Sequence, residues 1–160
     1  MILGAITPRV TPAGSRVGGG DVHRPRHHPA HHRHRPAAPT GLSARKVIVE
    51  RYFDGFRRSD HAQILSCLTD DVVWDLHGYQ RLEGKEAFDG EIENESFVGS
   101  PELTVDRLVE EGDVVVATGA GAGTLVSGQL FEFAFCTVFT FAGDLVGHVD
   151  SYIVPLTQLE

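Results

Sequence analysis

Apolar and polar residues alternate with two different periods along the chain, and each period predicts a different kind of element. Over residues 43–58 the large apolar side chains recur every three or four positions, which is typical of an amphipathic helix. Asp60 is followed three positions later by Gln63, which is the spacing of a capping box. This pair predicts a second, short helix that continues to about Leu68.

A third helix and five strands are predicted in the rest of the chain. The third helix begins at Gly84 and is expected to run to about Phe97, because Gly99 and Pro101 would end it. Runs of β-branched and aromatic residues bounded by turn residues predict strands at residues 72–77, 103–109, 114–126, 130–141 and 145–154. Tight turns join the last four strands, as in an antiparallel sheet. Helices gathered on one side of such a sheet make an α+β domain.

The strand at residues 130–141 has the most regular pattern. Its phenylalanines share one parity, with Thr137 as the only gap: Phe131, Phe133, Phe135, Phe139 and Phe141. Side chains alternate across a strand, so this face must be covered, and the helices are the available cover. Three glycines in the preceding strand, at 119, 121 and 123, allow strong bending. We therefore expect a cone-shaped curved sheet with the three helices on its concave face.

The opposite face of the same strand is mixed in character. It carries Ala134, Cys136 and Val138 between more polar residues, which makes it too apolar for a fully hydrated face. A second sheet packed there would cover it. The pattern predicts a homodimer that forms through the sheet.

The charge distribution divides the chain near residue 42. Residues 1–42 contain six Arg, one Asp and six of the nine histidines, whereas residues 43–160 contain eight basic and 21 acidic residues. The first segment is poor in large apolar side chains and is predicted to be a disordered tail, followed by a domain at 43–160. The tail could bind a divalent metal weakly, could contact an anionic polymer, or could have no function of its own.

Several classes of protein are disfavoured by what the sequence contains. Its two cysteines lie in apolar contexts, which favours reduced thiols and a cytoplasmic location. No apolar run reaches the roughly 18 residues that span a membrane. The domain shows no nucleotide-binding loop, metal-ligand cluster or nucleophile motif, so no cofactor and no metal are expected. Its acidic charge argues against nucleic-acid binding.

Three segments of the domain are similar to a known superfamily. Residues 49–52 (VERY), 68–75 (LTDDVVWD) and 84–88 (GKEAF), together with Asp60, resemble the nuclear transport factor 2-like superfamily. The nearest branches are ketosteroid isomerases and SnoaL-like polyketide cyclases, and the resemblance covers residues 43–156. It implies an apolar pocket inside an α+β cone. The superfamily includes isomerases, cyclases, dehydratases, epoxide hydrolases and binding modules, so it implies no single activity.

The resemblance can be followed residue by residue. In ketosteroid isomerases an Asp base works with an oxyanion hole made by a Tyr and a protonated Asp. Tyr52 matches the oxyanion Tyr, Leu76 stands at the position of the base, and Thr137 stands at the position of the oxyanion Asp. Because only one of the three catalytic groups is retained, steroid isomerisation by that mechanism is not expected.

Strand parity adds further candidates for the pocket. Five residues are expected to face inward and bind the substrate: Trp74, Leu76, Phe135, Thr137 and Phe139. Asp75 and His77 are expected to face outward. They remain second-tier candidates, because the register of a short, twisted strand can slip by one residue.

The last strand supplies the candidate catalytic groups. His148, Asp150 and Tyr152 alternate along it, and the resemblance places their face toward the pocket. Asp150 would correspond to the acid–base residue that SnoaL-like cyclases carry on a late strand. With His148 it could remove a proton next to a carbonyl, while Tyr52 donates to the enolate oxygen and Tyr152 contacts the substrate. A structural His148–Asp150 pair at a dimer edge is the alternative.

Three functions therefore remain open from the sequence. The first is a cofactor-independent isomerase, cyclase or lyase that acts on an apolar carbonyl compound. The second is a non-catalytic pocket for a small apolar or aromatic molecule. The third is a dimeric interaction module in which the pocket is only a filled core.

Overall fold

Three helices and a six-stranded sheet make up the part of the chain that the computed structural model describes, residues 42–93 and 95–157. The helices are α1 (Ala44–Arg58), α2 (His61–Leu65) and α3 (Lys85–Ile92). The strands are β1 (Leu68–Leu76), β2 (Gln80–Glu83), β3 (Phe97–Glu111), β4 (Val114–Leu125), β5 (Leu130–Ala142) and β6 (Leu145–Pro155). Nearly all of the predicted tail lies outside the described residues. No helix within them has the length and apolar character needed to cross a membrane.

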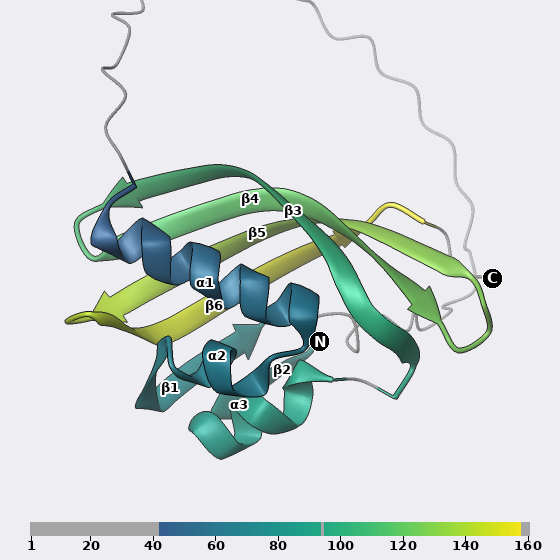
Figure 1. Cartoon of the computed structure of the whole chain (residues 1–160), viewed down its shortest axis with the longest axis horizontal. Helices are drawn as coiled ribbons and strands as arrows, with labels where there is room; N and C mark the ends of the chain where they lie inside the picture. Colours follow the sequence, from purple (N-terminus) through teal and green to yellow (C-terminus); the bar gives the residue numbers. More distant parts are fainter. Residues whose placement is uncertain (1–41, 94, 158–160) are drawn as a thin grey trace, which may run out of the picture. The chain divides into compact units, whose positions relative to one another are not determined.

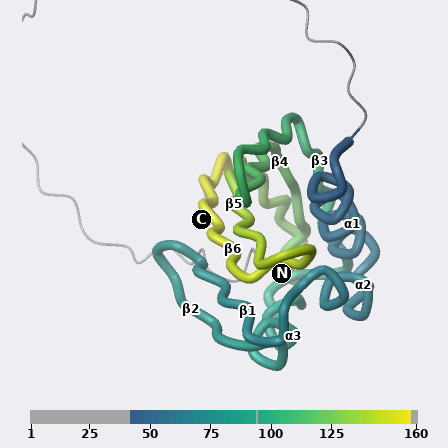
Figure 2. The backbone as a smooth tube through the Cα atoms, turned by 90° about the vertical axis from the view of Figure 1, so that its left-hand side faces the viewer, coloured from purple at the N-terminus to yellow at the C-terminus, as the bar shows by residue number. Residues whose placement is uncertain are grey.

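The six strands form one curved sheet in the order β2-β1-β6-β5-β4-β3. All neighbouring strands are antiparallel except β1 and β6, which run parallel. Helix α1 lies across the long strands, and the view turned by 90° shows α1 and α2 beside the curved sheet with α3 close to β1 (Figures 1 and 2). The predicted α+β cone is confirmed, but the sheet is mixed and not purely antiparallel.

The predicted helix starts are confirmed by their capping contacts. Ser43 precedes α1, and its Oγ accepts a hydrogen bond from the backbone N–H of Lys46 at 3.2 Å. Asp60 precedes α2, and its Oδ1 accepts from the backbone N–H of Gln63 at 3.0 Å. Between the two helices Ser59 adopts the left-handed conformation, with φ of 51°, and its N–H closes the last turn of α1.

The predicted end of the third helix is wrong. Helix α3 stops at Ile92, and Phe97 already belongs to β3, which continues through Pro101. The register between β3 and β4 shifts between Val98 and Glu102, and Gly99 has a φ of 72°. Because β3 is an edge strand, a bulge there accommodates both the glycine and the proline. The short strand β2 and the start of β1 at Leu68 were also not predicted.

The phenylalanine row of β5 forms the inner wall of the domain. All five rings are buried with at most 4% of their surface exposed, which confirms that they share one covered face. Two of them pack on the aromatic side of α1: Phe53 stacks on Phe135 at 5.4 Å between ring centroids, and Tyr52 meets Phe139 edge-on at 5.0 Å. These ring contacts join β5 to α1 across the core.

Glycines in β4 make room for these rings. A Cβ on Gly119 would lie 2.0 Å from the backbone oxygen of Thr104 and 2.7 Å from Phe135 Cζ. A Cβ on Gly121 would lie 2.3 Å from Phe133 Cζ. The rings of β5 therefore lean over the bare backbone of β4, which explains why these positions lack side chains.

We predict that Gly119→Ala destabilises the domain by about 1–3 kcal/mol, because the added methyl group overlaps a backbone oxygen and a core ring. Gly90→Ala is the matched control. A Cβ at Gly90 meets nothing within 4 Å, and Gly90 lies within α3, so this change should stabilise by about 0.5–1 kcal/mol. Urea unfolding followed by the fluorescence of Trp74, the single tryptophan, measures both. Equal effects of the two changes would contradict the packing described.

A second contact joins α2 to α3. Nδ1 of His61 lies 2.6 Å from Asp89 Oδ1, and its Nε2 lies 3.6 Å from Glu93 Oε2. The hydrogen bond to Asp89 raises the pKa of His61, and partial burial opposes this rise. Because the pKa is higher in the folded state, the pair stabilises fully below the unfolded pKa, and this stabilisation is lost as the pH rises through the folded value.

We therefore predict that His61→Asn lowers the free energy of unfolding most below about pH 6.5 and progressively less above it. Urea unfolding over a series of pH values, with parent and variant side by side, measures this difference. Asp89→Asn should give the same profile, because it removes the same pair. A difference that stays constant across the pH range would mean that the pair contributes nothing to the pH dependence.

Candidate functional site

Tyr52 places a hydroxyl group in the aromatic core. Its side chain lies in α1, is fully buried, and touches the rings of Phe56, Phe88 and Phe139. The hydroxyl has no hydrogen-bond partner among the described residues. Burial raises the pKa of Tyr52 well above its usual value, so the group stays protonated and available as a donor.

Two further hydroxyls face the same interior from the sheet. Thr137 of β5 and Ser151 of β6 are direct cross-strand partners, and each is only 1% exposed. Ser151 Oγ accepts a hydrogen bond of 2.9 Å from the indole N–H of Trp74, whose ring stacks on Phe88 at 4.2 Å. Within the described structure Thr137 Oγ1 has no such partner.

The interior site thus consists of neutral hydroxyls and an indole among aromatic rings. Such groups can hold a carbonyl or another hydrogen-bond acceptor in an apolar setting. The fully enclosed polar side chains of the described residues include no carboxylate and no imidazole.

The predicted inward residues are where the parity placed them. Trp74 and Leu76 of β1 are buried on the inner face, as are the three predicted residues of β5. Asp75 and His77 point outward, also as predicted. Their contacts are described below.

The predicted orientation of the last strand is wrong. His148, Asp150 and Tyr152 lie on the outer face of the sheet, because the residues between them, Val149 and Ser151, are the buried ones. The cause is a bulge in β6. Thr140 pairs with His148 and Phe141 pairs with Val146, so Gly147 is an extra residue that reverses the alternation. Asp150 and His148 are thereby separated from Tyr52 by the sheet.

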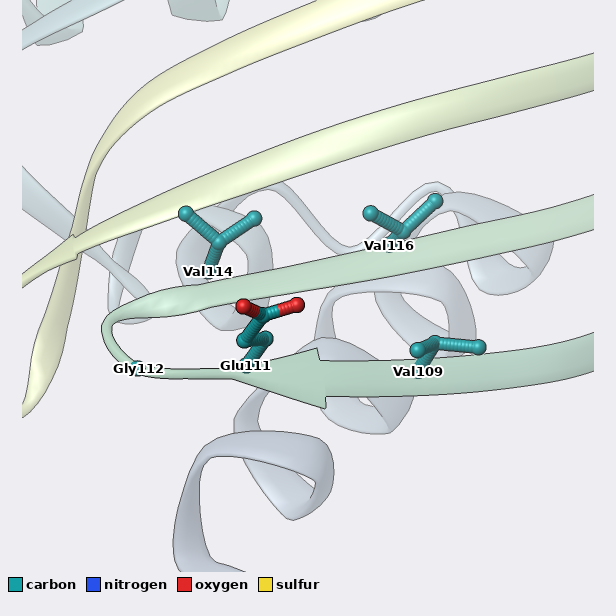
Figure 3. Close-up of a pocket in the computed structure, with 5 residues that line it drawn as sticks. All are labelled: Val109, Glu111, Gly112, Val114 and Val116. Carbon is teal, nitrogen blue, oxygen red and sulfur yellow. The ribbon is translucent and has the colours of Figure 1, made fainter.

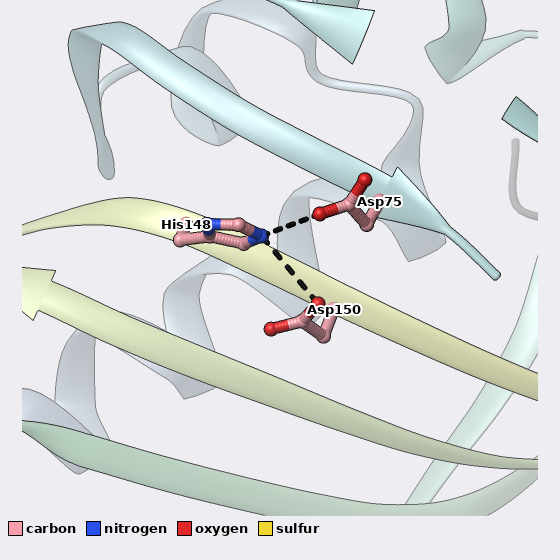
Figure 4. A group of neighbouring side chains, drawn as sticks. All are labelled: Asp75, His148 and Asp150. Atoms are coloured by element: carbon pink, nitrogen blue, oxygen red, sulfur yellow. Dashed lines mark hydrogen bonds and ion pairs between the residues drawn. The ribbon is translucent and has the colours of Figure 1, made fainter. Parts of the chain in front are cut away.

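These outward residues meet those of β1 in one cluster. Asp75 and Asp150 are direct partners across the parallel strands. His148 Nε2 lies 2.8 Å from Asp75 Oδ2 and 3.4 Å from Asp150 Oδ1. Figure 4 draws both contacts as dashed lines. His77 Nε2 lies 2.8 Å from Asp150 Oδ1. We call Asp75, His148, Asp150 and His77 the outer cluster.

Two more side chains border the outer cluster. Tyr152 stacks on the ring of His77, with 4.3 Å between centroids and an angle of 7° between planes. Arg81 of β2 places Nη1 3.2 Å from Asp75 Oδ2. The three closest ligand atoms, one each from Asp75, His148 and Asp150, all lie within 4.8 Å of one another.

This grouping was not predicted, although all four residues were candidates. The motifs D-L-H at 75–77 and H-V-D at 148–150 are mirror images, and each places its ends on one face of a strand. The pairing of β1 with β6 could not be read from local patterns, because it joins residues 73 positions or more apart. The mirrored motifs were the available signal.

The described surface pockets lie elsewhere. One, of about 430 Å³, lies at the β3–β4 hairpin and is lined by Val109, Glu111, Gly112, Val114 and Val116 (Figure 3). Another, of about 220 Å³, lies between the start of α1 and β3. Neither is lined by a residue that was predicted to bind substrate.

Comparison with solved structures shows which fold the domain has. An NTF2-like protein of unknown function from Burkholderia pseudomallei is 21% identical, with a TM-score of 0.65, over 71% of this chain and 92% of that one. An LEH-like epoxide hydrolase from M. tuberculosis is 19% identical (TM-score 0.61; 69% and 82% covered). A putative polyketide cyclase from Pseudomonas putida is 20% identical (TM-score 0.57; 70% and 92% covered). The domain therefore has the NTF2-like fold.

The family follows from the sequence match. The SnoaL-like domain family matches residues 49–148, which is more than half of the chain, so this chain belongs to that family. The search of curated proteins found no match.

The two inner hydroxyls of the sheet allow a direct comparison. We predict that Ser151→Ala destabilises the domain by about 1–3 kcal/mol, because the buried indole N–H of Trp74 loses its acceptor. Thr137→Val should instead be neutral or stabilising by about 1 kcal/mol, because it removes a buried hydroxyl without a described partner. Thermal and urea unfolding of both variants test this. A loss of stability in Thr137→Val as large as in Ser151→Ala would contradict it.

Proposed function

We propose that the domain binds a small, largely apolar molecule with a hydrogen-bond acceptor such as a carbonyl group, between α1 and the inner face of β5. The observation that carries this proposal is the pair of buried hydroxyls, Tyr52 on the helix and Thr137 on the strand, that have no hydrogen-bond partner among the described residues. Leaving a buried donor unsatisfied costs about 1–3 kcal/mol. A ligand acceptor would offset that cost.

The arrangement of the rings supports the same location. Phe53 contacts Phe135 and Phe139, the two residues that flank Thr137 on the inner face, and Tyr52 contacts Phe139. Tyr52 and Thr137 thus belong to facing walls of one aromatic enclosure. Aromatic walls with a few polar groups are typical of sites for small molecules.

Binding is favoured over acid–base turnover by this site. The predicted mechanism needed Asp150 and His148 beside Tyr52, and the sheet separates them. Similarity to a putative polyketide cyclase and an epoxide hydrolase is at the level of the fold, and it carries no activity to this chain. The neutral hydroxyl of Tyr52 remains suited to hold a carbonyl oxygen.

We predict that 1-tetralone, a bicyclic aromatic ketone, binds more tightly than tetralin, which has the same carbon skeleton without the oxygen. Quenching of Trp74 fluorescence reports occupancy, because this single tryptophan is buried in the same enclosure. Tyr52→Phe should weaken 1-tetralone binding about 3- to 10-fold, the value of one hydrogen bond, and leave tetralin binding unchanged.

Tyr79→Phe is the matched control, because this tyrosine is exposed on the surface and should have no effect on either compound. Equal weakening of both compounds by Tyr52→Phe would indicate a change of packing and not a lost hydrogen bond. If neither compound changes the fluorescence or the melting temperature, the enclosure is a filled core and the proposal fails.

The homodimer and the cytoplasmic location stay predictions. The outer face supports the former: alternate residues of β4 and β5, such as Val116, Ala134 and Val138, are small or apolar and only partly buried. The pocket in Figure 3 continues this apolar surface at the hairpin. We propose that a second copy of the chain covers it.

A further inference from the structure

We propose that the outer cluster is a binding site for a divalent transition-metal ion, with Asp75, His148 and Asp150 as ligands and His77 as a positioning residue. No described residue of the interior site takes part. The proposal is therefore independent of the proposed ligand binding.

The spacing of the donor atoms fits an ion of this kind. Metal bonds of about 2.1 Å place neighbouring ligand atoms about 3.0–3.4 Å apart in octahedral or tetrahedral geometry. His148 Nε2 lies 2.8 Å and 3.4 Å from the carboxylate oxygens of Asp75 and Asp150. The donor atoms of all three residues lie within 4.8 Å of one another, so small side-chain movements would bring them into a coordination shell. Imidazole and carboxylate donors together favour zinc and its neighbours in the first transition series.

The electrostatic repulsion between Asp75 and Asp150 also favours a cation between their carboxylates. Asp75 and Asp150 are directly opposite each other on adjacent strands, and like charges in that relation repel. Their side chains are largely withdrawn from water, at 19% and 25% exposed. A cation between them would convert this repulsion into attraction.

The ligands are held in place by a second layer of contacts. His77 is hydrogen-bonded to Asp150, and Tyr152 stacks on its ring and fixes the plane of the imidazole. The backbone N–H of His77 also donates to the carbonyl of Ser151 at 3.1 Å, so β1 continues its pairing with β6 past the cluster. Such outer contacts orient metal ligands and strengthen metal binding.

Arg81 distinguishes a metal site from an ion-pair network. Its side chain is long and exposed, and its guanidinium contacts Asp75 Oδ2. It would therefore compete with a cation for this carboxylate oxygen. In a metal site, removal of Arg81 should increase affinity for the ion. In a network that binds no ion, its removal would produce no zinc binding at all.

The test uses the full chain with the six histidines of residues 1–42 replaced by serine, so that the tail does not bind the added metal: His23, His27, His28, His31, His32 and His34. Three histidines then remain, at 61, 77 and 148. Titration with Zn²⁺ in a calorimeter should show one ion per chain. His148→Asn should weaken binding by at least about 100-fold and His77→Asn by about 10-fold.

Two further variants complete the comparison. His61→Asn, which changes the remaining histidine at a distant position, should leave zinc affinity unchanged, and Arg81→Gln should raise it several-fold. Both Arg81 and His77 are exposed, so these variants keep the proposal testable if His148→Asn fails to fold, which circular dichroism reports. The proposal is overturned if the tail-substituted chain takes up no zinc, or if His148→Asn or Arg81→Gln binds it as tightly as the parent.

Discussion

The packing of the β5 phenylalanines on the aromatic side of α1 determines most other features of this domain. It requires the odd-numbered side chains of β5 to face the helix. It also requires glycine at positions 119 and 121 of β4, because a Cβ there would overlap the rings of β5. Once the inner face is filled by rings, only neutral polar groups such as those of Thr137 and Ser151 are enclosed there. Charged residues of the same strands are left to the outer face.

Much of this arrangement could be predicted from local sequence. The parity of the phenylalanines, the two helix caps and the hairpin turns each depend on residues within a few positions of one another, and each was confirmed. The predictions were wrong where one local sequence pattern is compatible with two different structures. Gly99 and Pro101 are typical of the end of a helix, but they are equally compatible with a bulged edge strand. The pairing of this segment with β4 shows that it is a strand.

The candidate site was less predictable, for two physical reasons. A single extra residue, Gly147, reverses which face of β6 each later side chain occupies, and no composition signal distinguishes this bulge from an ordinary glycine. The outer cluster then depends on the parallel pairing of β1 with β6, the one non-antiparallel contact in the sheet. Thr137 could be found because it is the only gap in the phenylalanine row, and Tyr52 because the resemblance places it at the oxyanion position.

The separation of the two faces limits what each can do. A proton acceptor in the outer cluster cannot reach a molecule held between α1 and β5, because the sheet backbone and the buried Val149 and Ser151 intervene. A ligand that reaches Tyr52 must replace ring contacts that now enclose it fully. Only molecules in which these rings have moved apart can bind the ligand. The apparent affinity is therefore the intrinsic affinity multiplied by the fraction of such molecules. Flat aromatic molecules lose least by this exchange, because they restore the contacts that they displace.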